Sequence, residues 1–190
     1  MKLGTSVNSE TRRKALHMTA GALFLSFLLV FGRNRMVALL VLVLIGGLCI
    51  INMLLMGWRV PFTGWFIRNF ERQGVRFPGY ATAWYVSGLL MAATVLHDQG
   101  EIAAVICALA FGDGASAILG ERGERKLFYN KEKTAEGLAA FFAATLTSCL
   151  FVGWIGILFA ALAALFESLP LEVDDNFTIP LFGALFFYLV

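Results

Sequence analysis

The stretch Met36–Trp58, MVALLVLVLIGGLCIINMLLMGW, decides the fold class because it contains no charged side chain. A helix rises about 1.5 Å per residue, so this stretch is long enough to cross a hydrocarbon core of roughly 30 Å. Of all 190 residues, 59% are hydrophobic and only 15% are charged. A soluble domain has charged residues at about a quarter of its positions. The sequence therefore predicts an integral membrane protein.

Six further apolar segments flank this stretch. Together they predict an all-α, polytopic membrane protein with about six to seven transmembrane helices, forming a single domain over residues 1–190. The polar N-terminus is expected to lead into a retained helix and not a cleaved signal peptide. One helix over residues 138–166 would be ~43 Å long, so a hairpin at Gly153–Gly156 is the better interpretation. The predicted spans are Ala15–Phe31, Met36–Trp58, Tyr80–His97, Glu101–Gly120, Thr134–Val152, Gly156–Leu169 and Phe177–Val190, of which the last two are short.

Basic residues lie almost entirely on one side of the predicted membrane. All 15 Lys and Arg except Arg33 and Arg35 fall in the N-terminal tail or in the second and fourth loops, which share one side. By the positive-inside rule this side is cytoplasmic, so the N-terminus and the loop at residues 121–133 are expected there. The net charge of +2 is too small to suggest nucleic-acid binding.

Residues Val60–Gly79 predict an amphipathic helix that lies in the cytoplasmic interface. Aromatic residues recur there at helical spacing, while Arg68, Glu71 and Arg72 take another face. Two roles stay open: a connector that anchors two spans, or a lid or ramp for entering lipids. The aromatic residues are Phe62, Trp65, Phe66 and Phe70.

The fourth predicted span carries Asp113, roughly 10 Å from its cytoplasmic end. A carboxylate at this depth costs about 3 kcal/mol unless it is paired or hydrated, so Asp113 is a functional candidate. The alternative is a hydrogen bond between helices. Gly112, Ser116 and Gly120 form one face of small residues, which would let another helix approach closely.

The next loop ends in a candidate phosphate site. Lys131 and Lys133 precede Thr134, which we predict to cap the following helix. Free backbone amides at a helix N-terminus and two ammonium groups attract phosphate. The alternative is that the lysines only obey the positive-inside rule and that Glu136 is an ordinary residue of a first helical turn.

The last loop is acidic on an otherwise basic side. It has no Lys or Arg, whereas Glu167, Glu172, Asp174 and Asp175 precede Asn176. This concentration of oxygen ligands predicts a divalent cation, and Mg²⁺ bridging a polyphosphate is the favoured interpretation. The alternative is that Asn176 caps the last helix and the two aspartates favour its dipole.

The start of the first span adds Arg13, Lys14 and His17 on the same side of the membrane. His17 would lie about one turn inside, where it either packs against a neighbour or contacts phosphate. Cations for phosphate, carboxylates for metal and an apolar interior for lipid are the parts of a phosphoryl- or nucleotidyl-transfer site. A small proton-coupled transporter that uses Asp113 and His17 is a further alternative. No Walker A or dinucleotide-binding motif is present in the sequence.

Four motifs, spread in order from Arg12 to Leu181, resemble those of the dolichol kinase and phytol kinase family. That family also includes CTP-dependent diacylglycerol kinases and is related to phosphatidate cytidylyltransferases. Gly114 departs from the alanine that is common in the family, and Leu138 from a serine. The motifs are Arg13-Lys14-x-x-His17, Gly112-Asp113-Gly114-Ala115 with Gly120, Lys133-Thr134-x-Glu136-Gly137, and Asp174-Asp175-Asn176-x-Thr178-Ile179-Pro180-Leu181.

This resemblance implies a CTP-dependent lipid kinase that transfers the γ-phosphoryl group to the hydroxyl of a lipid alcohol. The acceptor would be a polyprenol such as dolichol, a phytol-like alcohol or diacylglycerol, with Mg²⁺ as cofactor and CTP as co-substrate. A cytidylyltransferase that makes a CDP-lipid is the nearest alternative, although the signature of those enzymes is missing. The oligomeric state, a homodimer included, stays open.

The resemblance and the local chemistry together define the expected site. The expected catalytic residues are Asp113, Asp175 and His17, and the expected metal ligands are Asp113, Asp174, Asp175 and Asn176. The residues expected to bind nucleotide or phosphate are Arg13, Lys14, Gly112, Gly114, Gly120, Lys131, Lys133, Thr134, Glu136 and Gly137.

Overall fold

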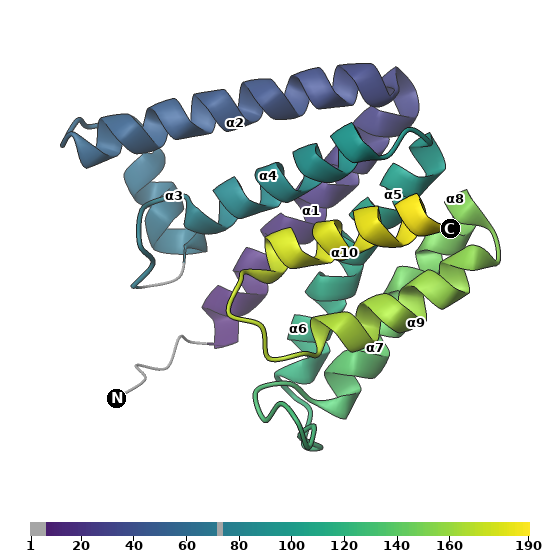
Figure 1. Cartoon of the computed structure of the whole chain (residues 1–190). Coiled ribbons are helices and arrows are strands. Elements are labelled where there is room, and N and C mark those ends of the chain that lie inside the picture. Colours follow the sequence, from purple (N-terminus) through teal and green to yellow (C-terminus); the bar gives the residue numbers. More distant parts are fainter. Residues whose placement is uncertain (1–6, 72–73) are drawn as a thin grey trace.

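The computed structural model describes residues 7–71 and 74–190, and its regular elements in these ranges are all helical (Figure 1). A single antiparallel bridge, between Lys126 and Thr134, is the nearest approach to a strand in the described part of the chain. The predicted all-α class is therefore confirmed. The elements are α1 (Val7–Phe31), α2 (Arg33–Leu55), α3 (Thr63–Phe70), α4 (Tyr80–Val95), α5 (Gln99–Cys107), the π-helical turn η1 (Ala108–Gly112), α6 (Asp113–Gly120), α7 (Ala135–Thr145), the 3₁₀ turn η2 (Leu146–Ser148), α8 (Cys149–Val152), α9 (Ile155–Glu167) and α10 (Asp175–Leu189).

Each predicted span corresponds to a helix or to a run of consecutive helices. Within the described residues, four of these are long and apolar enough to cross a membrane: 11–31, 33–55, 99–120 and 135–152. α9 is apolar but shorter. The predicted hairpin is confirmed, because α8 ends at Val152, Gly153 has a left-handed φ of +65°, and α9 begins at Ile155.

The run from α5 through α6 forms the centre of the molecule. Its residues 102–110 are all buried, and many of them are alanines, whose small side chains let the surrounding helices pack closely. α2 lies at the periphery and exposes Leu42, Ile45 and Leu48. Such an apolar surface suits contact with lipid and not with water.

Small residues set the spacing of the helices, as predicted for the fourth span. A Cβ added to Gly120 would lie 3.3 Å from Gly137 Cα on α7, and one added to Gly112 would lie 2.4 Å from Thr145 Oγ1. α4 and α10 approach in the same way, since a Cβ on Gly88 would lie 2.5 Å from the carbonyl oxygen of Asn176. These glycines bring the polar ends of α6, α7 and α10 together.

The turn η1 changes the backbone pairing directly before Asp113. The amide of Asp113 donates to the carbonyl of Ala108, five residues back. In a regular α-helix it would donate to Leu109, four residues back. The carbonyl of Leu109 instead accepts a hydrogen bond from a side chain of α1, as described below.

The loop at residues 121–133 and the α9–α10 connection lie at the same end of the molecule (Figure 1). Asn130 Nδ2 donates to the carbonyl of Ser168 at 2.9 Å, and Tyr129 Oη lies 2.6 Å from Ser168 Oγ. At the opposite end, Arg33 Nε donates to the carbonyls of Ala93 and Leu96 and so closes the C-terminus of α4. The structure thus brings together the two loops in which the sequence concentrates its cations and its carboxylates.

Candidate active site

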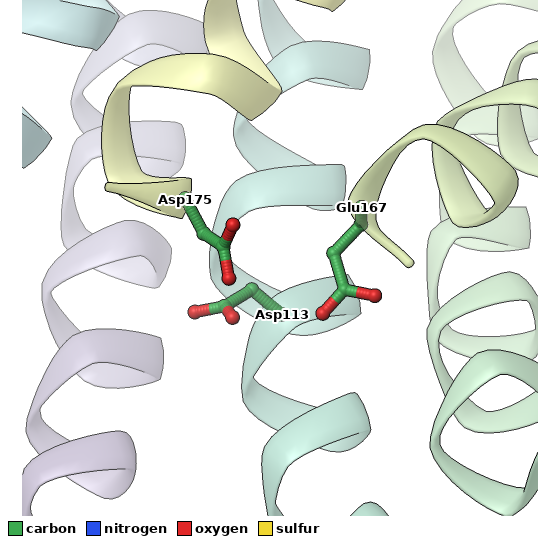
Figure 2. A group of neighbouring side chains, drawn as sticks. All are labelled: Asp113, Glu167 and Asp175. Carbon is green, nitrogen blue, oxygen red and sulfur yellow. The ribbon is translucent and has the colours of Figure 1, made fainter. Parts of the chain in front are cut away.

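Three carboxylates from three helices meet at the end of the molecule that carries these loops (Figure 2). Asp113 begins α6, Glu167 ends α9, and Asp175 lies in the first turn of α10. One ligand oxygen from each lies within 4.8 Å of the other two. The side chains of Asp113 and Glu167 are almost fully buried, with 5% and 2% exposed. We call these three residues the carboxylate cluster.

Two lysines offset most of the negative charge of the carboxylate cluster. Lys14 Nζ of α1 donates to Asp113 Oδ2 at 2.6 Å. Lys133 Nζ, from the loop before α7, donates to Glu167 Oε1 and lies 3.1 Å from Asp175 Oδ2. Two ammonium groups therefore face three carboxylates, which leaves one negative charge when all five groups are ionised. Pairing of this kind lets carboxylates persist at a buried position.

Lys133 keeps its charge in this setting. Burial by itself would lower the pKa of Lys133, but the nearby carboxylates of Glu167 and Asp175 raise it, and the net pKa lies above the ordinary value for lysine. Lys133 is therefore a permanent cation at physiological pH. Its flexible side chain carries a compact charge that suits both a carboxylate and a phosphate.

His17 links α1 to the turn η1. Its Nε2 lies 2.8 Å from the carbonyl oxygen of Leu109 and 3.4 Å from Asp113 Oδ2. A carbonyl only accepts hydrogen bonds, so Nε2 carries a proton and donates it. Tyr85 packs edge-on against the imidazole, with ring centroids 4.6 Å apart. These contacts fix the orientation of His17 beside Asp113.

The loop that carries Lys133 is held by the start of α7. Thr134 caps that helix as predicted, because its side chain accepts from the amide of Gly137 at 3.1 Å. The same hydroxyl donates to the carbonyl of Gly120 at the end of α6. The carboxylate of Glu136 accepts from the amide of Arg125 across the loop. Thr134 and Glu136 thus position the loop and do not contact the carboxylate cluster.

The structure brings together five of the residues singled out in the sequence: Lys14, His17, Asp113, Lys133 and Asp175. Arg13 lines a cavity next to Lys14 and His17. Gly112, Gly114, Gly120 and Gly137 lie where helices or side chains approach closely, with Gly114 against Met18.

Lys131, Asp174 and Asn176 lie outside the carboxylate cluster. Lys131 is exposed. Asp174 caps α10, because its Oδ1 accepts from the amide of Asn176 at 3.0 Å. The interpretation that Asn176 is the cap is therefore wrong by two residues. Asn176 is buried, and its side-chain amide donates to the carbonyl of Ala81.

The sequence identifies Glu167 only as part of the acidic loop, yet in the structure it is buried as deeply as Asp113. Ser116 on α6 also donates to Glu167, at 3.0 Å. The signal for Glu167 was its position: a lone carboxylate at the end of the apolar segment Ile155–Glu167. From the sequence, Ser116 is expected only as a small residue that permits close packing.

The carboxylate cluster fits a divalent cation. Mg²⁺ takes oxygen ligands at about 2.1 Å, so the ligands of one ion are at most about 4.2 Å apart. The oxygens of the cluster lie within 4.8 Å, so modest rotations of the side chains would bring them onto one ion. The ammonium groups of Lys14 and Lys133 already pair with these oxygens. A bound cation would balance the same negative charge in their place.

Comparison with known proteins identifies relatives along nearly the whole chain. A farnesol kinase of Arabidopsis thaliana chloroplasts is 34% identical over 194 residues, and a probable phytol kinase 2 of Oryza sativa subsp. japonica chloroplasts is 34% identical over 197 residues. The matches cover 91% and 90% of this chain and 63% of each plant protein. The chain thus spans less than two thirds of the length of these two relatives.

An uncharacterised protein of Methanocaldococcus jannaschii is 29% identical over 174 residues, which cover 90% of this chain and 88% of that protein. No protein-family model matches the chain. No solved structure matches it either. The predicted resemblance is confirmed by the two plant proteins: the chain is similar to proteins named farnesol kinase and phytol kinase, consistent with the dolichol and phytol kinase family.

Proposed function

We propose that this protein is a lipid kinase that transfers the γ-phosphoryl group of CTP, with Mg²⁺, to the hydroxyl of an isoprenoid alcohol in the membrane. The observation that carries the proposal is the buried carboxylate cluster with two lysines at one end of an apolar helical protein. The plant relatives, which are named for kinases of farnesol and phytol, support the isoprenoid acceptor. CTP is the donor that the motif resemblance implies.

In this proposal, Asp113, Glu167 and Asp175 hold the metal. When bound, Mg²⁺ would neutralise charge on the β- and γ-phosphates. Lys14 and Lys133 would then exchange their carboxylate partners for phosphate oxygens, since both are already within reach of the metal-binding oxygens. Of Lys131 and Lys133, Lys133 is the stronger candidate, because Lys131 does not share its contacts with the carboxylate cluster.

In this proposal, Asp113 acts on the lipid hydroxyl that accepts the phosphoryl group. It is the one member of the cluster that contacts both Lys14 and His17, and these two residues line a neighbouring cavity. The lipid oxygen would form a bond to the γ-phosphorus as the bond to the β,γ-bridging oxygen breaks. CDP would leave, and Asp113 would take the hydroxyl proton. His17 would orient Asp113, because its Nε2 proton is already donated to Leu109.

The test is a product analysis with purified protein in lipid nanodiscs. We expect label from γ-³²P-CTP, and none from α-³²P-CTP, to appear in farnesol, geranylgeraniol or phytol, with ATP and UTP as competing donors. EDTA should abolish the transfer, and Mg²⁺ should restore it. Label from α-³²P-CTP in the lipid would show a cytidylyltransferase. No transfer from any of the three nucleotides would refute a kinase.

Asp113→Asn should lower the rate by about 10²–10⁴-fold, the range typical of a lost acid–base group. Glu172→Gln is the matched control, because Glu172 is an exposed carboxylate of the same acidic connection. The control should keep the rate of the unmodified protein. Equal rates for both variants would remove Asp113 from the chemistry.

A further inference from the structure

An apolar cavity of about 350 Å³ lies between α2, α3 and the start of α4. Gly47, Ile51 and Leu54 line it from α2, and Phe66 lines it from α3. Apolar cavities of roughly this size are typical of small-molecule sites. In a membrane protein, the hydrocarbon chain of a lipid could fill this cavity, since such a chain has no hydrogen-bonding groups that would be left without a partner.

This cavity continues into a second one of about 250 Å³, which is lined by Arg13, Lys14 and His17. The two cavities have five lining residues in common and therefore adjoin. The second cavity reaches the side chains that contact Asp113. The shared residues are Val43, Phe66, Gly79, Thr82 and Val86.

The polar end of this path holds an unsatisfied hydroxyl. Tyr85 lines the second cavity, its side chain is buried, and its Oη has no hydrogen-bond partner among the residues that the structure describes. A buried polar group without a partner is costly and calls for an explanation. Because this hydroxyl is closed off from water and lies next to Gly21, the Tyr85 side chain must turn before a bound alcohol near His17 can pair with it.

We propose that the two cavities form the binding site for the lipid alcohol, with its isoprenoid chain between α2, α3 and α4 and its hydroxyl beside Lys14 and His17. This inference rests on the proposed kinase function. It gives α3 the role of covering the chain, and it makes Gly47 the residue that sets how long a chain is accepted. Gly47 does so because its missing side chain leaves the cavity open on the α2 side.

Gly47 and its neighbour Gly46 form a matched pair. A Cβ added to either residue would meet no atom within 4 Å, so neither position is closed to a side chain. Only Gly47 lines the cavity, whereas Gly46 is exposed on α2. Leucine is also a better helix former than glycine, so both variants should fold.

The experiment measures phosphorylation of geraniol, farnesol and geranylgeraniol by Gly47→Leu and Gly46→Leu. We expect Gly47→Leu to phosphorylate geraniol as the unmodified protein does and to lose at least about tenfold on geranylgeraniol, because the added side chain overfills the cavity. Gly46→Leu should keep the original preference. Identical chain-length profiles for the two variants would overturn the proposed site.

A second measurement does not depend on catalysis. A photoreactive farnesol analogue with a diazirine on its terminal isoprene unit is added without nucleotide, and the cross-linked peptides are identified. Labelling of α2 and α3 that falls in Gly47→Leu but not in Gly46→Leu supports the site, even if no kinase activity is found. Labelling confined to other helices, or equal in both variants, refutes it.

Discussion

Asp174 and Asp175 are adjacent in the chain but have different partners. Asp174 caps α10 by accepting from the amide of Asn176, whereas Asp175 points to Lys133 and the carboxylate cluster. The sequence motif assigned both to metal binding. The geometry separates a residue that starts the helix from a residue that faces the proposed metal.

Asp174→Asn and Asp175→Asn therefore make a matched pair. Asparagine caps a helix about as well as aspartate, so Asp174→Asn should keep stability and stay within about twofold of the original rate. Asp175→Asn should lose at least the 10–100-fold that is typical even of outer partners of a metal site. Rates and Mg²⁺ dependence would be measured for both. A similar loss in the two variants would mean that Asp174 also binds the metal.

Lys133→Gln and Lys131→Gln make a second matched pair, which is compared by the stability of the folded protein. Lys133→Gln leaves buried Glu167 without its cation and should cost about 3 kcal/mol, the lower end of the range for a broken buried pair. Lys131→Gln should stay within about 0.5 kcal/mol, as exposed substitutions usually do. Thermal unfolding in detergent would measure both. Equal effects would contradict the special role of Lys133.

The pH dependence of this difference follows from the raised pKa of Lys133. A group whose pKa is higher in the folded state contributes its stability fully below the unfolded pKa, which is about 10.4 for lysine. That contribution is lost only as the pH rises through the folded pKa. Titration of Lys133 should therefore not change the difference in the free energy of unfolding between the original protein and Lys133→Gln from pH 6 to pH 9.

At the scale of elements, the contact between α4 and α10 controls where Asp175 lies. Gly88 of α4 approaches the carbonyl of Asn176 so closely that an added Cβ would lie 2.5 Å from that oxygen. The oxygen belongs to the backbone and cannot rotate away. A larger residue at position 88 must shift the first turn of α10, which carries Asp175.

Gly88→Ala should therefore lower both stability, by about 1–3 kcal/mol, and kinase activity. Gly46→Ala is the control, because its Cβ would meet no atom within 4 Å. Alanine favours a helix over glycine, so this control should be neutral or slightly stabilising. Unfolding temperature and phosphorylation rate would be recorded for both. A stable and fully active Gly88→Ala would show that the α4–α10 contact tolerates movement.

The sequence predicted the helices and the hairpin at Gly153–Gly156 because apolar runs and glycine act locally. It did not predict η1, since nothing in Ala108–Gly112 distinguishes a π-helical turn from an α-helical one. The Lys14–Asp113 pair joins residues 99 positions apart. Such pairs depend on how helices pack, which periodicity does not determine. For the same reason Glu167 was recognised as acidic but not as a member of the carboxylate cluster.

At the scale of the whole molecule, the helix arrangement places residues 121–133 and 168–174 at one end and residues 96–99 at the other (Figure 1). The distribution of Lys and Arg predicts that the first end faces the cytoplasm. The proposed site requires this end to be accessible to a soluble nucleotide. The membrane orientation is therefore a direct test of the model of function.

Single cysteines in a background without the three native ones would measure this orientation. An impermeant maleimide should label Glu124→Cys and Glu172→Cys from the cytoplasmic side of sealed vesicles and His97→Cys from the other side, since all three positions are exposed. Opposite sidedness of Glu124→Cys and Glu172→Cys would contradict the arrangement. Labelling of both only from the outer side would place the proposed site away from cytoplasmic nucleotide.

The π-helical turn also constrains how this protein can change during evolution. Each α-helical residue rotates the chain by about 100°, so losing one residue from Ala108–Gly112 would carry Asp113 round the helix and away from Lys14 and His17. Residues in this turn can be exchanged for others of similar size, but their number is fixed by the direction of one carboxylate. An insertion or deletion in this turn should therefore break the Lys14–Asp113 pair, whereas a substitution that keeps the size of the side chain should leave it in place.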